Sequence, residues 1–187
     1  MYRKTFLILL ILIAFGVGAA FAEDQATLQG EQLSKTCAAC HGTDGASPGK
    51  MIPVIGGQVE KYLQKTLVEF AADKRPGDVM KNLAKGYSAG EQKQIAVYFA
   101  DKPWIRTPHA VASAVDASLV SGCKGCHGSQ GEGRGSFPRV AGQHPDYLYQ
   151  ALVEYKQGTR SSSLMKSVKK LDDATLKQMA DYYSSLK

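Results

Sequence analysis

The sequence predicts an all-α protein made of two tandem homologous domains, and three observations support this fold class. A cysteine-containing motif occurs twice, and the residues around it are repeated about 85 positions later. Apolar residues recur at the three- and four-residue spacing of amphipathic helices, and no stretch alternates apolar and polar residues as a half-buried strand does. The 187 residues, 44% of them hydrophobic and 21% charged, can build packed cores.

The N-terminal 22 residues have the composition of an export signal. Arg3 and Lys4 form a basic start, an apolar run covers residues 6–17, and small residues at 20–22 form a cleavage pattern. Cleavage there leaves 165 residues and lowers the net charge from +6 to +4. We predict a signal peptide at 1–22 and a periplasmic location, with retention of this segment as an anchor as the alternative.

The charged residues argue against one class of partner. The mature excess of about four positive charges is mild, and the Lys and Arg residues are scattered along the chain. Nucleic-acid binding calls for a basic patch with aromatic residues or a known module. We therefore expect no nucleic-acid partner and assign these charges to a solvated surface.

The repeat is clearest in the motif Cys-x-x-Cys-His-Gly, which spans residues 37–42 and returns at 123–128. At an offset of 85 residues the matched pairs include Pro53 with Pro138, Gln58 with Gln143, Tyr62 with Tyr147, Glu69 with Glu154, Arg75 with Arg160 and Met80 with Met165. A repeat of this length is a domain rather than a solenoid unit. We predict a first domain at 23–101, a linker at 102–112 and a second domain at 113–187.

Each domain is predicted to contain three helices separated by two loops. In the first domain the motif ends one helix, a Gly- and Pro-rich loop follows at 42–57, and apolar spacing predicts a second helix over 59–70. The last helix begins at Ser88, because Glu91 three residues later completes a capping box.

The second domain repeats this order, and the linker is predicted to be stiff. Its middle helix begins at Pro145, a residue favoured in a first helical turn, and its last helix begins after Asp172 or Asp173. The linker holds Trp104 between two prolines, a composition typical of a partly packed connector. We expect the two domains to touch.

The four cysteines allow three chemical interpretations, since both pairs are followed directly by histidine. A CxxC pair can be a redox dithiol, and two pairs can together hold one zinc ion. The third interpretation is covalent haem attachment, in which two thiols bind the haem and the adjacent histidine reaches the iron. The residues concerned are Cys37, Cys40, His41, Cys123, Cys126 and His127.

The repeat favours two covalently bound c-type haems with iron. Each motif lies within its own small domain, so a site shared between the pairs is not needed, and export suits haem attachment outside the cytoplasm. A domain of about 80 residues with long Gly-rich loops also buries little apolar surface by itself. A large apolar group in each domain would complete its core.

Two methionines are the candidate second iron ligands. Met80 and Met165 occupy the same position in both repeats, which favours ligation over core packing, the commoner role of methionine. Met51 is the rival in the first domain, whereas His109 and His144 have no counterpart in the repeat. A His/Met pair leaves no open iron position, which predicts electron transfer rather than catalysis on a substrate.

Other matched residues receive weaker interpretations. Arg75 and Arg160 either pair with haem propionates or lie on the surface. Tyr62 and Tyr147 are expected in the helix cores, with packing at the haem edge as the alternative. Pro53 and Pro138 are expected to shape the loops after the motifs, as is the Gly-rich stretch 128–135, which has no nucleotide-binding spacing.

The mature chain resembles the dihaem cytochromes c of the cytochrome c4 type. The resemblance is carried by CAACHGTDG at 37–45, GGQ at 56–58, CKGCHG at 123–128, FPRVAGQ at 137–143, GTR at 158–160 and both methionines. The stretch KRPGDVMKNLAKGYS at 74–88 is similar to the cytochrome subunit of flavocytochrome c sulfide dehydrogenase. The first domain departs from the c4 pattern with IPVIGG at 52–57 and Asp-Lys-Arg at 73–75.

The resemblance implies two class I cytochrome c domains with axial pairs His41–Met80 and His127–Met165. It also implies thioether bonds at the four cysteines, and redox proteins as partners. As a carrier the chain would deliver electrons to a terminal oxidase or a similar acceptor, and a peripheral association with a membrane is compatible with this role. As the haem subunit of an enzyme it would receive electrons from a flavoprotein dehydrogenase. We favour the carrier.

Overall fold

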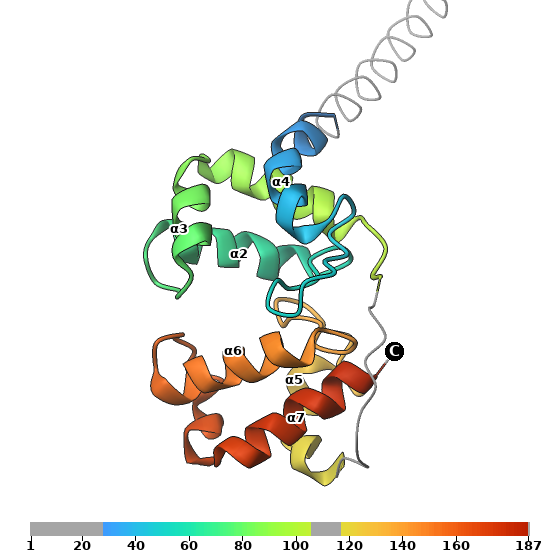
Figure 1. The fold of residues 1–187 in the computed structure, drawn as a ribbon, viewed down its shortest axis with the longest axis vertical. Helices are drawn as coiled ribbons and strands as arrows, with labels where there is room; N and C mark the ends of the chain where they lie inside the picture. Colours follow the sequence, from blue (N-terminus) through green and yellow to red (C-terminus); the bar gives the residue numbers. More distant parts are fainter. Residues whose placement is uncertain (1–27, 106–116, 187) are drawn as a thin grey trace, which may run out of the picture.

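The computed structural model describes residues 28–105 and 117–186, which form two helical domains stacked along the long axis of the molecule (Figure 1). Within these ranges the structure contains helices and one isolated β-bridge, and the predicted all-α class is confirmed. The predicted signal peptide at 1–22 and linker residues 106–112 lie outside the described residues. No described helix has both the length and the apolar composition needed to cross a membrane.

The first domain is helical over residues 28–41 and continues with α2 (Glu60–Ala71), α3 (Asp78–Lys85) and α4 (Ala89–Ala100). Helix α2 packs against both α3 and α4. The buried core of the first domain contains Cys37, Leu63, Ile95, Ala96 and Phe99. The predicted capping box is present at the start of α4, where the Ser88 N–H donates to the Glu91 carboxylate at 2.7 Å and the Ser88 hydroxyl accepts from the Glu91 N–H.

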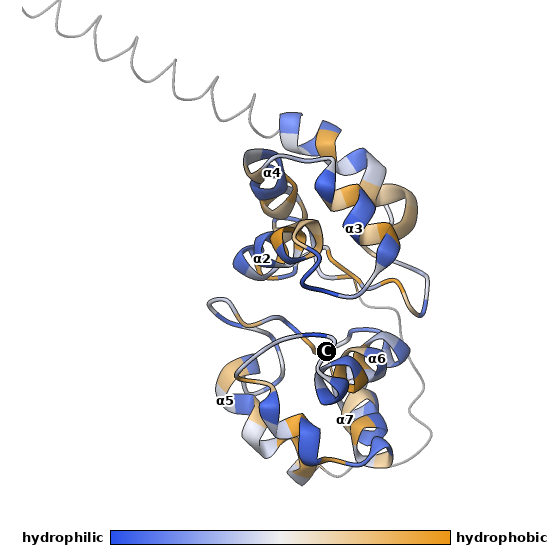
Figure 2. Ribbon diagram, turned by 90° about the vertical axis from the view of Figure 1, so that its left-hand side faces the viewer, coloured by the Kyte–Doolittle hydropathy of each residue, from blue (hydrophilic) through white to orange (hydrophobic). Residues whose placement is uncertain are grey.

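The second domain begins with the 3₁₀ helix η1 (Ala117–Cys123) and the one-turn helix α5 (Lys124–His127). It continues with α6 (Pro145–Gln157), the 3₁₀ helix η2 (Lys166–Lys170) and α7 (Asp173–Ser185). Helix α6 packs against α7 and η2. The buried core contains Val120, Leu148, Val168, Leu176, Met179, Ala180 and Tyr183. The labelled helices carry both hydrophobic and hydrophilic residues, as helices with one buried side do (Figure 2).

The helix starts of the second domain agree with the sequence prediction. Pro145 occupies the first turn of α6. Asp172, rather than Asp173, caps α7 by accepting a hydrogen bond from the Thr175 N–H at 2.7 Å. A carboxylate at this position satisfies one of the free N–H groups of the first turn.

Each domain has a short helical element between the predicted middle and last helices that was not expected, and in the second domain the predicted motif helix is divided into η1 and α5. The additional elements are α3 and η2, and they contain or follow the candidate methionines. Met80 lies in the first turn of α3, whereas Met165 lies in a turn that directly precedes η2. Elements of eight and five residues are too short to show a repeated apolar spacing, so the sequence pattern did not indicate them.

The Gly- and Pro-rich loops that follow the two motifs bring the domains together. Gly57 and Gly142 have φ angles of +66° and +67°, in the left-handed region that glycine adopts without strain. Their N–H groups donate to the carbonyls of Phe99 and Tyr183, each at 2.8 Å. The loops are therefore fixed to the last helix of their own domain, and the residue after each glycine is directed toward the other domain.

The described part of the linker is packed, as the sequence predicted. The Arg139 guanidinium lies 4.9 Å from the ring centroid of Trp104. A Cβ atom added to Gly57 would lie 2.7 Å from the backbone nitrogen of Trp104. The start of the linker thus contacts both the loop of its own domain and the second domain.

Candidate functional site

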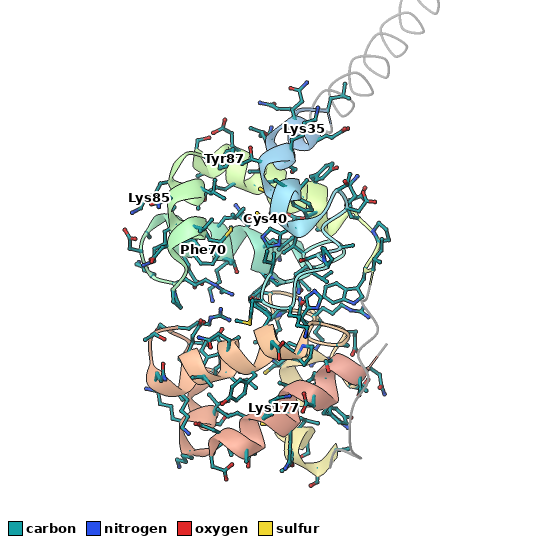
Figure 3. The ribbon with its side chains drawn as sticks, in the orientation of Figure 1. Lys35, Cys40, Phe70, Lys85, Tyr87 and Lys177 are labelled. Carbon is teal, nitrogen blue, oxygen red and sulfur yellow. The ribbon has the colours of Figure 1, made fainter. Side chains whose placement is uncertain are left out.

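Each CxxCH motif ends in a histidine that is the last residue of a helical segment. The helix over 28–41 ends at His41, and α5 ends at His127. In the first domain Cys37, Cys40 and His41 stand at helical positions i, i+3 and i+4, which lie on one side of a helix. Cys37 is buried and Cys40 is exposed. Figure 3 shows Cys40 on the side of its helix that is turned toward α2 and α3.

Both histidine rings are held by a proline carbonyl in the following loop. The His41 Nδ1 lies 2.8 Å from the Pro53 oxygen, and the His127 Nδ1 lies 2.9 Å from the Pro138 oxygen. Because a carbonyl can only accept, Nδ1 carries the proton and Nε2 keeps its lone pair. Among the described residues neither Nε2 has a hydrogen-bond partner. Each ring is therefore prepared to bind a metal through Nε2.

Burial sets the protonation of the histidines and of the inner cysteines. It lowers the pKa of His41 and of His127, and the proline carbonyls offset this only in part. The neutral imidazole, which is the form that ligates a metal, is therefore favoured. Burial also raises the pKa of the Cys37 and Cys123 thiols.

The placement of the cysteines distinguishes the three chemical interpretations. A zinc site needs both CxxC pairs in one place. All four cysteines are described, yet no three His, Cys, Asp or Glu side chains in the described part of the chain form a group that could hold a metal. Each domain instead has its own two free thiols, one imidazole with an available Nε2, and a matched methionine. This set of donors fits one covalently attached haem in each domain.

The candidate methionines differ from their rivals in burial. Met80 and Met165 are half-buried, and Met165 packs against the core of the second domain. Met51 exposes 54% of its surface, as a solvent-facing side chain does. His144 is buried, with Nε2 2.9 Å from the Ser47 carbonyl of the other domain. His109 lies outside the described residues.

The matched arginines are buried, and the surface alternative for them is wrong. Arg75 exposes 3% and Arg160 7% of their area. Each guanidinium has a carboxylate nearby. Arg75 Nη1 lies 3.7 Å from Glu69 Oε2, and Arg160 Nη2 lies 2.9 Å from Glu154 Oε2. The buried Nε atoms of both arginines have no hydrogen-bond partner in the described structure. Unpaired buried cationic donors are rare, and they fit an anionic group such as a haem propionate.

The matched tyrosines lie between the domains. We had expected them in the helix cores. Arg75 donates to the Tyr62 hydroxyl at 2.9 Å and to the Tyr147 hydroxyl of the second domain at 3.3 Å. Burial favours the neutral phenol, but the guanidinium groups of Arg75 and Arg160 outweigh it and lower the pKa of Tyr62. The two domains thus share a buried cluster of arginine and tyrosine side chains.

Two functional features were missed by the sequence analysis. Pro53 and Pro138 were expected only to shape loops, but their carbonyls orient the histidines. Gln58 and Gln143 were noted as matches in the repeat, and the structure places both in the domain interface. In the sequence, the only indication of these roles was that the residues occupy matched positions in the two repeats.

Comparison with known proteins agrees with this geometry. A family model described as cytochrome c matches residues 28–101 and 117–187. A cytochrome c4 from Pseudomonas aeruginosa is 30% identical over 198 residues, covering 96% of this chain and 98% of the relative. The cytochrome subunit of a sulfide dehydrogenase from Chlorobaculum tepidum is 44% identical over 73 residues, covering 39% of this chain and 66% of that protein.

A solved structure is also similar over most of the chain. It is the crystal structure of reduced recombinant cytochrome c4 from Pseudomonas stutzeri, with a TM-score of 0.71 and 26% sequence identity. The match covers 84% of this chain and 97% of that one. Both domains of the present chain are therefore included in the likeness.

Proposed function

The chain belongs to the cytochrome c family as a dihaem electron-transfer protein of the c4 type, and from this premise we propose that it is a periplasmic carrier with one His/Met-ligated haem in each domain. The proposed axial pairs are His41 with Met80 and His127 with Met165. The proposed thioether residues are Cys37, Cys40, Cys123 and Cys126. The bound haem supplies a one-electron couple at its iron.

The observation that carries this proposal is the repeated bond between a motif histidine and a proline carbonyl. It fixes the ring orientation and the Nδ1–H tautomer, and it leaves the Nε2 lone pair of His41 and His127 for an iron ion. The sulfur of Met80 or Met165 would supply the second iron ligand in its domain. Such a site excludes substrate from the iron, which suits electron transfer and raises the potential relative to bis-His ligation.

Arg75 and Arg160 have a supporting role in the proposal. Their buried Nε donors are available to haem propionates. A propionate near each guanidinium would neutralise a charge that is costly to bury. The arginines would in this way hold the haem edge near the domain interface.

The proposed partners are soluble or membrane-bound redox proteins. The full-length likeness to cytochrome c4 supports a free carrier that gives electrons to a terminal oxidase or a similar acceptor. The partial likeness to a sulfide dehydrogenase subunit supports a second candidate, in which the chain is the haem subunit of a flavoprotein dehydrogenase. Purification from the native host separates the two, since a carrier is recovered alone and a subunit with its flavoprotein.

The first test is the intact mass of the denatured protein after expression in a host that attaches haem. Noncovalent groups dissociate on denaturation, whereas thioether-bound haem stays. We expect the mass of residues 23–187 plus two haems. A mass that retains residues 1–22 would contradict the signal peptide, and a bare polypeptide mass would contradict haem attachment altogether.

A further inference from the structure

Two glutamines join the domains by the same bonds in opposite directions. Gln58 of the first domain accepts from the Arg139 N–H at 2.7 Å and donates through Nε2 to the Arg139 carbonyl at 2.9 Å. Gln143 of the second domain accepts from the Val54 N–H at 2.9 Å and donates to the Val54 carbonyl at 2.8 Å. Val54 and Arg139 occupy matched positions in the repeat. The two glutamines therefore make equivalent pairs of hydrogen bonds to equivalent residues of the opposite domain.

Each glutamine side chain is also held in place by a hydrogen bond within its own domain. Gln58 exposes 4% and Gln143 2% of their area. Each Oε1 also accepts the N–H of the next residue, Val59 at 2.9 Å and His144 at 3.0 Å. A buried amide with both Oε1 and Nε2 bonded has one favourable orientation, so its position is preorganised.

The peptide units that the glutamines contact are the ones that hold the motif histidines. The Val54 N–H belongs to the same peptide unit as the Pro53 carbonyl, which accepts from His41 Nδ1 at 2.8 Å. In the second domain the Pro138 carbonyl accepts from His127 Nδ1, and the Arg139 N–H of the same peptide unit donates to Gln58. A continuous hydrogen-bond chain thus runs from each imidazole, through a peptide, to a side-chain amide of the other domain.

The direction of the effect follows from peptide resonance. An N–H that donates a hydrogen bond moves electron density toward the carbonyl oxygen of its own peptide, and bonds in such a chain strengthen one another. A stronger bond from Nδ1–H to that oxygen makes Nε2 more basic. A more basic ligand stabilises the ferric iron relative to the ferrous iron.

We propose that each glutamine is a positioning residue that lowers the reduction potential of the haem in the other domain. Gln143 acts on the haem of the first domain through Val54 and Pro53. Gln58 acts on the haem of the second domain through the peptide between Pro138 and Arg139. The inference rests on the proposed ligation by the two motif histidines. It makes domain docking a determinant of both potentials.

The test is a spectroelectrochemical titration of the full-length dihaem protein with Gln143→Leu or Gln58→Leu. We expect Gln143→Leu to raise the potential of the first-domain haem and to leave the other unchanged, and Gln58→Leu to do the reverse. The expected size is about a threefold change in the redox equilibrium, or about 30 mV at 59 mV per tenfold. Comparison with Met80→Ala and Met165→Ala assigns each wave to its domain.

Two controls separate this role from a purely structural one. His144→Val, which introduces the residue found at the matched position 59, removes a bond between the domains, the one from His144 Nε2 to the Ser47 carbonyl at 2.9 Å, without touching a histidine-bonded peptide. We expect it to move neither wave. Gln143→Glu keeps an acceptor oxygen for the Val54 N–H and removes the Nε2 donor. We expect the first-domain potential to stay the same or fall, whereas loosening of the interface would move it as Leu does.

The inference is overturned if Gln143→Leu moves both waves equally or neither, if His144→Val reproduces its effect, or if Gln143→Glu raises the potential. Should the Leu variants fail to fold, Gln143→Asn and Gln58→Asn, which withdraw the amide by one methylene, carry the same crossed expectation. Failure of the proposed function looks different. It appears as a missing haem mass, or as spectra that neither methionine variant alters.

Discussion

The two domains hold their motif histidines by the same hydrogen bond on different secondary structure. The bond from the histidine Nδ1 to the proline carbonyl measures 2.8 Å in the first domain and 2.9 Å in the second. Yet His41 ends a helix that is continuous from residue 28, whereas His127 ends a single turn that follows a 3₁₀ helix. Met80 lies in an eight-residue α-helix, and Met165 precedes a five-residue 3₁₀ helix. The same histidine–proline bond is thus formed on two different arrangements of supporting helices.

The interface shows a similar division between repeated and divergent contacts. The bonds of Gln58 and Gln143 are the same in both directions. His144, however, bonds to the Ser47 carbonyl, and its counterpart Val59 has no polar side chain to return this bond. The pattern next to the histidine peptides is symmetric, and the symmetry is lost one residue farther along the chain.

The largest expected effect concerns the independence of the two domains. Met80→Ala and Met165→Ala should each remove one axial ligand, change the oxidised spectrum of one haem and leave the other intact. The potential of the affected haem should fall by on the order of 60 mV or more, which corresponds to a tenfold or greater change. Optical and electron paramagnetic resonance spectra of each purified variant provide the measurement.

Two outcomes would contradict the prediction that each methionine variant affects one haem only. If neither variant changes the oxidised spectrum, the methionines are not ligands. If one variant changes both haems, the domains are coupled more strongly than their separate cores indicate. Met51→Ala is the matched control in the first domain, and because its side chain is exposed we expect no spectral change.

The second expected effect distinguishes the two buried arginines. Arg160 lies 2.9 Å from a carboxylate that is itself 13% exposed, whereas the carboxylate near Arg75 is 3.7 Å away and 23% exposed. Arg75 also donates to two tyrosine hydroxyls. We therefore expect Glu154→Gln to lower the free energy of unfolding by about 2 kcal/mol. Glu69→Gln should lower it by about 0.5–1 kcal/mol.

Urea unfolding of the ferric protein checks this order. The glutamine replacements keep the size of the side chain, so the comparison isolates the charge. Equal losses in the two variants would mean that the arginines have equivalent support, contrary to the distances.

The smallest expected effect concerns the caps of the last helices. Ser88→Ala and Asp172→Ala should each lower the Tm by about 2–4 °C, since each removes an N-cap. Hydrogen bonds from Ser88 lower the pKa of Glu91, and hydrogen bonds from Thr175 lower the pKa of Asp172. Depressed carboxyl pKa values stabilise the folded state above the ordinary values of about 4.3 and 3.9, and this contribution is lost as the pH falls through the lowered values.

Calorimetric scans from pH 7 to pH 3 test this sign. In the wild type the Tm should decrease at the acid end, and Asp172→Ala should reduce that dependence. A Tm difference that grows as the pH falls would contradict the assignment.

Local signals were predicted well from the sequence. The capping box at Ser88 and Glu91 and the start of α6 at Pro145 depend on neighbours within four residues, and both were found. The contacts of Tyr62 and Arg75 were missed, because their partners belong to the other repeat or to distant parts of their own. The apolar spacing around Tyr62 indicated only that one side of its helix is covered, and a second domain covers it as well as a core does.

The sequence by itself determined the two domains, the two CxxCH sites and the matched methionines, since repetition and spacing are readable along the chain. The tertiary structure alone decided which carbonyl holds each histidine and which amide of the other domain contacts that same peptide. The histidine–proline bonds join residues 12 and 11 positions apart, and the glutamine bonds join residues 81 and 89 positions apart. No periodicity encodes such contacts, because the first kind depends on how a loop packs on its own domain and the second on how the two domains dock.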